Sequence, residues 1–253
     1  MMKKIVLTTL ALIMMSTSAS FAAGSAEEPP KQDWSFSGIF GTYDRGALQR
    51  GLKVYREVCS ACHSLDRVAF RNLADFGYNE EQLKSIASEY VITDGPDEEG
   101  EMFERAGRPS DYFPAPYPNV NAAKAANGVA PPDLSLITKA RHGGADYVYG
   151  ILTGYEAAPD GHHLASGQYW NKYMSGHVIA MPAPLTDELV EYTDGTPMSL
   201  EQYARDVAQF LTWAAEPELE RRKKYGIAAL IFLCLFACIM YGVKKKIWAD
   251  VKH

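Results

Sequence analysis

The chain has 253 residues and a formal net charge of −6, with 31 Asp and Glu against 25 Lys and Arg. Residues 24–220 carry 30 acidic and 15 basic side chains, a balance of −15. A domain with this charge repels nucleic acid and attracts basic proteins, and the rate of such association falls as salt rises. We therefore expect no nucleic-acid partner. The densest acidic cluster consists of Asp94, Asp97, Glu98, Glu99, Glu101 and Glu104.

The first 23 residues have the pattern of a secretory signal peptide. Lys3 and Lys4 precede an apolar run that is too short to span a bilayer, and small residues around Ala22 and Ala23 suit cleavage. The sequence thus predicts a signal peptide over residues 1–23. It also predicts that the following domain, residues 24–220, is exported and large enough for a packed core.

The first half of the exported domain contains two predicted helices and one long loop. Apolar residues recur at helical spacing from Asp44 to His63, so a helix is expected to end in the motif described below. Asn79 as a cap with Gln82 three residues later predicts the start of a second helix. Residues 93–132 are rich in Gly, Pro, Asn and acidic residues, and they are expected to form a long ordered loop.

The second half is predicted to add two more helices before a membrane anchor. One begins near Ala145 and stops at Gly154, and a strong amphipathic helix begins after Ser199, with Gln202 in the capping-box position. Pro217 suits the first turn of the anchor helix. The expected fold is mainly α, with long loop insertions and little strand.

The sequence Cys59-Ser60-Ala61-Cys62-His63 is the C-x-x-C-H signature of covalent c-type haem attachment. Two thiols three positions apart on one helical turn face the same side, where they can add to the two vinyl groups of a porphyrin. The adjacent imidazole then lies against the iron. The motif predicts one covalently attached haem c with His63 as an axial ligand. The mainly α domain, with its long loop insertions, is therefore expected to be a cytochrome c-like haem domain.

Two other uses of the thiols fit the sequence less well. A zinc site would need a second pair of ligands, and the remaining cysteines, Cys234 and Cys238, lie inside an apolar run. A thioredoxin-like dithiol would follow a strand, whereas an amphipathic helix is predicted before this motif. These comparisons favour haem attachment.

The second axial ligand is predicted to be Met181. It lies in an apolar, proline-stiffened loop, Ile179–Pro184, just before the last helix of the domain. A thioether is soft and neutral, so it favours ferrous iron, and a closed sixth position excludes oxygen and peroxide chemistry. Spacing leaves other candidates open: Met102, Met174, Met198, His142, His162, His163 and His177.

Two further residues are candidates for contacts around the haem. The carbonyl of Pro132, in the segment Ala130–Leu134, could accept the free ring N–H of His63 and fix its tautomer. Arg141 could bind a haem propionate through two hydrogen bonds. A plain surface role for Arg141 is equally compatible with the sequence.

The region from Tyr225 to Val243 contains 19 residues without a charge. This length suits one transmembrane helix, with Tyr225, Tyr241 and Trp248 at its interfaces. The prediction is an anchor over residues 221–246 with basic flanks, followed by a short cytoplasmic tail over residues 247–253. The haem domain would then lie on the periplasmic side of the inner membrane.

Several stretches together resemble the bacterial members of the cytochrome c1 family, the haem subunits of quinol:cytochrome c oxidoreductase (the cytochrome bc1 complex, complex III). They include RGLKVYREVCSACHSLDRVAFR, SDYFPAPYPN, KARHGGADYVYGILTGY, IAMPAPL and DGTPMSLEQYARDVAQFLTWAAEPE. The resemblance extends from about Trp34 to Trp248. It implies a membrane-bound electron carrier that receives an electron from the Rieske iron-sulfur protein and passes it to a soluble basic cytochrome c.

The resemblance also implies cytochrome b as a partner and a dimeric complex. It places covalent attachment at Cys59 and Cys62, axial ligation at His63 and Met181, and a propionate contact at Arg141. The chain has Met-Pro-Ala-Pro where many relatives place the prolines differently, and it lacks the extra cysteine pair of some bacterial members. No disulfide is expected.

Two alternative functions use the same haem motif. A cytochrome c subunit of a terminal oxidase would have other partners, and a membrane-tethered haem peroxidase would need an open sixth position. In the leading interpretation the chain has no substrate chemistry of its own. It belongs to an enzyme only as the electron-carrier subunit of an oxidoreductase.

Overall fold

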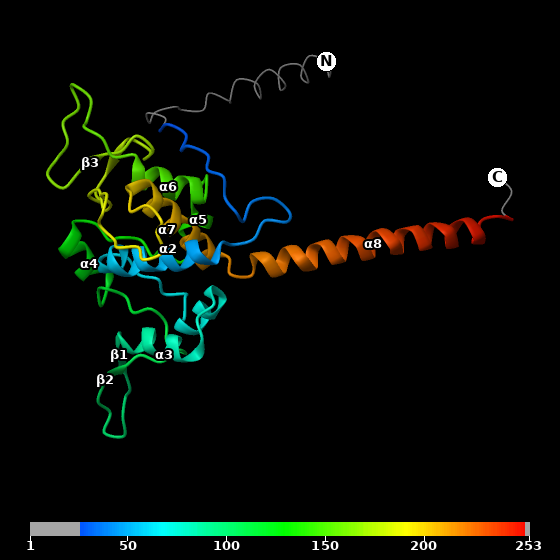
Figure 1. The fold of residues 1–253 in the computed structure, drawn as a ribbon, viewed down its shortest axis with the longest axis horizontal. Helices are drawn as coiled ribbons and strands as arrows, with labels where there is room; N and C mark the ends of the chain where they lie inside the picture. The colour runs from blue at the N-terminus through cyan, green and yellow to red at the C-terminus, as the bar shows by residue number, and fades with distance from the viewer. Residues whose placement is uncertain (1–25, 251–253) are drawn as a thin grey trace, which may run out of the picture.

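The computed structural model describes residues 26–250, so the predicted signal peptide and the last three residues of the predicted tail lie outside the described residues. A helical body is followed by one long C-terminal helix, α8 (Leu219–Ile247), which extends away from it (Figure 1). This confirms the prediction of a mainly α fold with a long apolar helix at its C-terminal end.

The body is built around the crossing of α2 (Arg45–Glu57) and α7 (Leu200–Ala215). Helices α5 (Ile137–Ala140) and α6 (Ala145–Thr153) also pack against α7. A Cβ on Gly51 would lie 2.2 Å from the carbonyl oxygen of Asp206, so only glycine allows the backbones of α2 and α7 to approach this closely. The crossing buries the largest apolar side chains of the core, among them Leu48, Leu52, Tyr55, Phe210 and Trp213.

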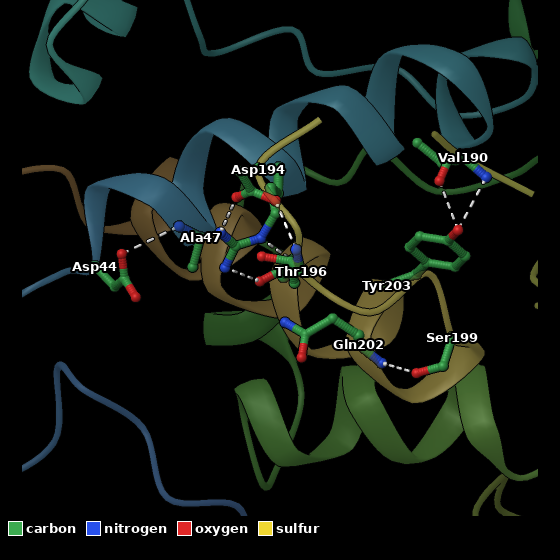
Figure 2. Close-up of polar contacts among 10 residues, drawn as sticks. Asp44, Ala47, Val190, Asp194, Thr196, Ser199, Gln202 and Tyr203 are labelled. Carbon is green, nitrogen blue, oxygen red and sulfur yellow. Dashed lines mark hydrogen bonds and ion pairs between the residues drawn. The ribbon is translucent and has the colours of Figure 1, made fainter. Parts of the chain in front are cut away.

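Side-chain caps mark where these helices begin, and of the two only the Ser199 cap was predicted from the sequence (Figure 2). The side chain of Asp44 accepts the Ala47 N–H at 3.2 Å at the start of α2, and the Ser199 hydroxyl accepts the Gln202 N–H at 3.3 Å at the start of α7. Each bond satisfies a backbone donor that has no partner within the helix. Both starts agree with the sequence prediction to within one residue.

Beside the core lie η2 (Phe70–Phe76) and α3 (Glu80–Ser88), which contact each other. Asn79 and Gln82 form the predicted capping box, in which each side chain accepts the other residue's backbone N–H at 2.9 Å. Helix α6 also ends as predicted, because Gly154 is its C-cap. Local signals of this kind were sufficient to locate these two helices.

The prediction of one long loop over residues 93–132 is wrong in part. The segment contributes to an antiparallel hairpin, β1 (Val91–Asp94) with β2 (Phe103–Ala106), and contains α4 (Val120–Asn127). The hairpin turn is closed by the Asp97 carboxylate, which accepts the backbone N–H groups of Glu99 and Glu101 at 3.0 and 2.9 Å. The hairpin extends away from the helical body (Figure 1).

A second, two-residue hairpin lies between α6 and α7. It pairs β3 (Tyr169–Trp170) with β4 (Val178–Ile179), where the sequence predicted only a loop. Tyr203 of α7 ties the segment after β4 to the core. Its hydroxyl donates to the Val190 carbonyl at 2.6 Å and accepts the Val190 N–H at 3.2 Å (Figure 2).

Helix α8 begins at Leu219 with Glu218 as its N-cap, two residues before the predicted anchor boundary at residue 221. Pro217 therefore precedes the helix and does not occupy its first turn. The chain breaks after α7 because the Glu216 carbonyl accepts the Leu219 N–H in a separate turn. The most apolar 18-residue window of α8 has a mean hydropathy of 2.5 and none of it is buried among the described residues, so α8 is a candidate membrane span.

We expect Asp206→Ala to be strongly destabilising. Asp206 is fully buried in α7, and its two carboxylate oxygens accept from the Arg50 guanidinium at 2.9 and 3.1 Å. Removing it leaves the largely buried guanidinium with only the exposed Asp194 as a partner, which costs about 3 kcal/mol in the free energy of unfolding. Chemical unfolding of the detergent-solubilised protein measures this loss.

Asp194→Ala is the matched control, because Asp194 binds the same guanidinium at 2.8 Å from an exposed position. Solvent screens that pair, so its removal should cost much less than the removal of Asp206. Equal losses for the two variants would show that burial of the Arg50–Asp206 pair contributes nothing.

Candidate haem site

The C-x-x-C-H motif lies on a tight turn directly after α2. Helix α2 ends at Glu57, and Cys59–Ala61 forms the 3₁₀ turn η1, so the prediction of a helix continuing to His63 is wrong. Val58 leaves the helical conformation, with φ −121°. The carbonyl of Cys59 then accepts the N–H groups of both Cys62 and His63, at 3.1 and 2.9 Å. The core crossing of α2 and α7 therefore holds the motif in place.

The imidazole of His63 has a defined tautomer. Its Nδ1 lies 2.8 Å from the carbonyl oxygen of Pro132. A carbonyl can only accept, so Nδ1 carries the proton and Nε2 keeps the lone pair that a metal would bind. Burial lowers the pKa of His63, while the Pro132 carbonyl and Asp133 act in the opposite direction. The lowered pKa favours the neutral ring, which is the form that can be a ligand.

The Asp133 carboxylate clamps the segment after Pro132 against the motif. One of its oxygens accepts from the Ser64 hydroxyl at 3.0 Å and from the Asp66 N–H at 2.9 Å. The other accepts the Ser135 N–H at 2.9 Å. The Leu134 N–H also donates to the Ser64 carbonyl at 3.0 Å. This clamp keeps the Pro132 carbonyl within reach of His63.

Neither motif cysteine is in a disulfide. Burial raises the pKa of the Cys59 thiol to about 12, so it is a neutral thiol at physiological pH. The Cys62 thiol lies 3.8 Å from the side-chain oxygen of Asn127 at the end of α4. A thiol held neutral by burial is a poor zinc ligand and a poor nucleophile in disulfide exchange.

Met181 is half-buried and packs against the edge of the hydrophobic core, as Val58 and Cys59 do. Its carbonyl accepts from the Tyr155 hydroxyl at 3.0 Å, so Tyr155, two residues after the end of α6, holds the methionine loop. Tyr155 is itself held by a β-bridge to Asn171. The methionine loop and the motif turn therefore both border the same core.

The other candidate axial ligands lie in different environments. Met102 is 59% exposed in the turn of the first hairpin, directly before β2, and Met198 is 38% exposed. The sulfur of Met174 accepts from the Tyr147 hydroxyl at 3.6 Å. His177 stacks on Trp170, with ring centroids 4.8 Å apart. The remaining histidines, His142, His162 and His163, are exposed. The choice of Met181 stays a prediction.

Arg141 is exposed and follows α5 directly. Its guanidinium donates to the neighbouring Ala140 carbonyl at 3.2 Å, and no carboxylate within residues 26–250 pairs with it. Gly143 and Gly144 have φ values of +88° and +56°, a region that favours glycine, and they turn the chain into α6. The guanidinium is free to bind an anion, and a propionate contact stays a prediction.

These residues fit a covalently attached haem. Two thiols and an imidazole with a free Nε2 share one turn, a half-buried thioether borders the same core, and a guanidinium without a carboxylate partner among the described residues is available for a propionate. The sequence did not identify the Asp133 clamp or the Tyr155 contact. The pattern Asp133-Leu134-Ser135 could have indicated the clamp, because aspartate often accepts the backbone N–H two residues later. The Tyr155–Met181 contact joins distant positions and leaves no local pattern.

Comparison with known proteins adds an independent result. The profile of the Cytochrome C1 family matches residues 34–251. "Cytochrome c1" of Rhodospirillum rubrum is 46% identical over 240 residues, covering 88% of each chain. "Cytochrome c1, heme protein, mitochondrial" of Saccharomyces cerevisiae is 47% identical, covering 94% of this chain and 78% of the yeast protein. "Cytochrome b/c1" of Bradyrhizobium diazoefficiens is 50% identical, and the match covers 95% of this chain but 38% of that protein.

Proposed function

The chain belongs to the cytochrome c1 family, and we propose that, as the haem subunit of a cytochrome bc1 complex, it accepts an electron from the Rieske iron-sulfur protein and passes it to a soluble basic cytochrome c. The observation that supports this most strongly is the C-x-x-C-H turn, in which the Pro132 carbonyl holds His63 with Nε2 free. This turn belongs to a body that continues through α7 into a helix long enough to span a membrane.

Cys59 and Cys62 would hold one haem covalently, and that group would supply a one-electron couple. His63 would bind its iron through Nε2, and the hydrogen bond to Pro132 increases the basicity of the ring. Met181 would bind the iron through its thioether, a ligand that raises the reduction potential and excludes oxygen. Arg141 would offset the charge of a propionate. Because His63 and Met181 are both held from the packed core, the ligand set changes little between oxidation states.

The chain itself carries no substrate chemistry and contributes to catalysis only as the electron carrier of an oxidoreductase. The division proposed from the sequence is a signal peptide over residues 1–23, an exported haem domain over 24–220, an anchor over 221–246 and a cytoplasmic tail over 247–253. The haem domain then faces the periplasm from the inner membrane. Cytochrome b and the Rieske protein are the proposed partners in a dimeric complex.

The first hairpin is the proposed docking surface for the basic cytochrome c. Glu98, Glu99, Glu101 and Glu104 are exposed there, and none of them forms an ion pair within the described part of the chain. By contrast, Asp94 and Asp111 bind Arg105 and so serve the structure of the hairpin. We expect glutamine at all four glutamate positions to lower kcat/KM for the soluble cytochrome by about 2- to 10-fold at low salt, because steering charges act mainly on association.

The dependence of the reaction rate on salt distinguishes a loss of electrostatic steering from damage to the protein. Above the ionic strength at which surface charges are screened, the four-glutamine variant and the parent should react at the same rate. A control variant removes four exposed carboxylates from other surfaces and should retain the parent rate: Glu28→Gln, Glu81→Gln, Glu191→Gln and Glu201→Gln. An equal loss in both variants would mean that net charge, and not the hairpin, attracts the acceptor.

Purification through a tag on this chain tests the proposed function as a whole. A mild-detergent extract should yield a complex that contains a cytochrome b and an iron-sulfur protein, and it should transfer electrons from quinol to a basic cytochrome c. Recovery with terminal-oxidase subunits in their place would favour the alternative electron-transfer function. Rapid carbon monoxide binding by the reduced native protein would favour a haem enzyme with an open position.

A further inference from the structure

A short uncharged turn, residues 37–41, exposes two large apolar side chains beside the anchor helix; we call it the apolar turn. Phe40 is 84% exposed and Ile39 is 66% exposed, and no other large apolar side chain described in residues 26–250 is as exposed as Phe40. Apolar side chains that are exposed next to one another, unlike scattered single ones, mark surfaces that bind protein or membrane. The apolar turn needs a surface to cover it.

The backbone of the apolar turn is tightly closed. The Ser37 N–H donates to the Trp34 carbonyl at 2.9 Å, and the Thr42 N–H donates to the Ser35 carbonyl at 3.0 Å. A Cβ on Gly41 would lie 2.0 Å from the Ser37 carbonyl oxygen, so the closure requires glycine at that position. The exposed pair is therefore presented by a defined turn between two closing hydrogen bonds.

The start of α8 is bound to both sides of this turn. The Lys223 ammonium donates to the carbonyls of Phe36 at 2.6 Å and Gly41 at 3.0 Å. The Glu220 carboxylate accepts the Tyr43 N–H at 2.7 Å and pairs with Arg45 at 2.8 Å. In Figure 1 the segment before α2 loops out alongside the first turns of α8. The apolar turn is thus fixed next to the point where the uncharged part of α8 begins.

The apolar turn differs in charge from the rest of the domain. No charged residue occurs from Trp34 to Tyr43, although residues 24–220 carry a balance of −15. Four consecutive basic residues, Arg221 to Lys224, precede the uncharged part of α8. An anionic bilayer surface repels the acidic remainder of the domain and attracts basic side chains, although Arg221 and Arg222 of this collar are already paired with Glu218 and Glu216. The apolar turn and the collar together form a surface suited to lipid.

We propose that the apolar turn is a second membrane contact, in which Ile39 and Phe40 insert into the interfacial region of the bilayer beside the anchor. The occupant is lipid, because Lys223 binds both sides of the turn and Tyr225, two residues later, is 65% exposed at the start of the uncharged part of α8. Aromatic side chains favour that depth. With the anchor helix, this contact fixes the tilt of the haem domain above the membrane.

This inference rests on the proposed membrane anchor, and spin labels can test the two separately. The full complex is reconstituted in phospholipid vesicles with the haem reduced, and a nitroxide is attached at Phe40→Cys in a Cys234→Ala, Cys238→Ala background. Collisions with oxygen, which concentrates in the bilayer, are compared with collisions with a water-soluble nickel chelate. The expected ratio of oxygen to nickel accessibility is several-fold higher at position 40 than at the control Met102→Cys, which is also exposed. Ile39→Cys provides a second site.

Two results at position 40 would overturn the proposal. High nickel accessibility would place the turn in water, and an immobilised label shielded from both reagents would place it against a protein subunit. The reference for the anchor is a separate protein that keeps Phe40 and Cys234, with a nitroxide attached to Cys234 within α8. High oxygen accessibility at Cys234 together with either negative result at position 40 would overturn the second contact alone. Low oxygen accessibility at Cys234 would overturn the anchor and the inference together.

Discussion

Replacing Cys59 and Cys62 together by alanine is expected to abolish covalent haem attachment completely. Both thiols lie on the same turn, η1 and the residue after it, and neither is in a disulfide. Thioether bonds survive denaturation, whereas a haem held only by axial ligands is released. The measurement is haem-dependent peroxidase staining of the mature protein after denaturing electrophoresis. The parent should stain and the double variant should not.

The chain contains its own control for this experiment. Cys234 and Cys238 form a second pair, one helical turn apart, on the exposed surface of α8. Replacing both by alanine should leave the stain unchanged, because their thiols lie in the anchor. If haem remained covalently attached to the protein without Cys59 and Cys62, the assignment of the motif would be wrong.

The second large effect is expected for Met181→Leu. Leucine fills a similar volume but has no lone pair for iron, so the potential should fall and the absorption spectrum should change. Axial ligation sets haem potentials over a range of about 0.8 V, and a fall of about 0.1–0.3 V is expected when a thioether is lost. Redox titration of the complex followed by absorption spectroscopy measures both changes.

Met174→Leu is the matched control for the Met181 prediction. Met174 lies in the same region, but its sulfur accepts from the Tyr147 hydroxyl at 3.6 Å, so its loss should affect packing and leave the potential unchanged. An unaltered spectrum in Met181→Leu, or an altered one in Met174→Leu, would assign the axial position to another residue.

Much of the helical framework could be predicted from local sequence. Asn79 with Gln82, Asp44 and Ser199 all mark helix starts through side-chain oxygens that accept nearby N–H groups. These signals depend on residues three positions apart and therefore need no tertiary information. The long apolar helix α8 was equally easy to predict from local sequence, because 19 consecutive uncharged residues suit a bilayer and few other environments.

Other features depend on contacts that the local pattern does not contain. The first hairpin forms around Asp97 and the Arg105 ion pairs, in a segment whose glycines, prolines and acidic residues indicated a loop. The motif turn tightens after Val58 although the apolar spacing continues to Cys59. Pro217 stands before α8 because Glu216 and Leu219 close a turn of their own.

In the candidate site, too, some residues could be predicted from local sequence and others could not. A five-residue motif was enough to predict Cys59, Cys62 and His63, since thioether attachment requires those residue types at that spacing. The contacts that hold the two candidate ligands come from distant segments: Pro132, which was proposed from the sequence, holds His63, and Tyr155, which no local pattern indicated, holds Met181. Arg141 has no binding partner among the described residues, so its role depends on the propionate prediction.

The most direct test of the proposed electron path is quinol-driven reduction of the purified complex in the absence of a soluble acceptor. A reduced-minus-oxidised spectrum recorded after rapid mixing should show a single c-type haem reduced through the iron-sulfur protein. Adding a basic cytochrome c should then reoxidise that haem, at a rate that falls with ionic strength. A c-type haem that stayed oxidised under quinol while cytochrome b was reduced, with the iron-sulfur protein present and intact, would contradict the account.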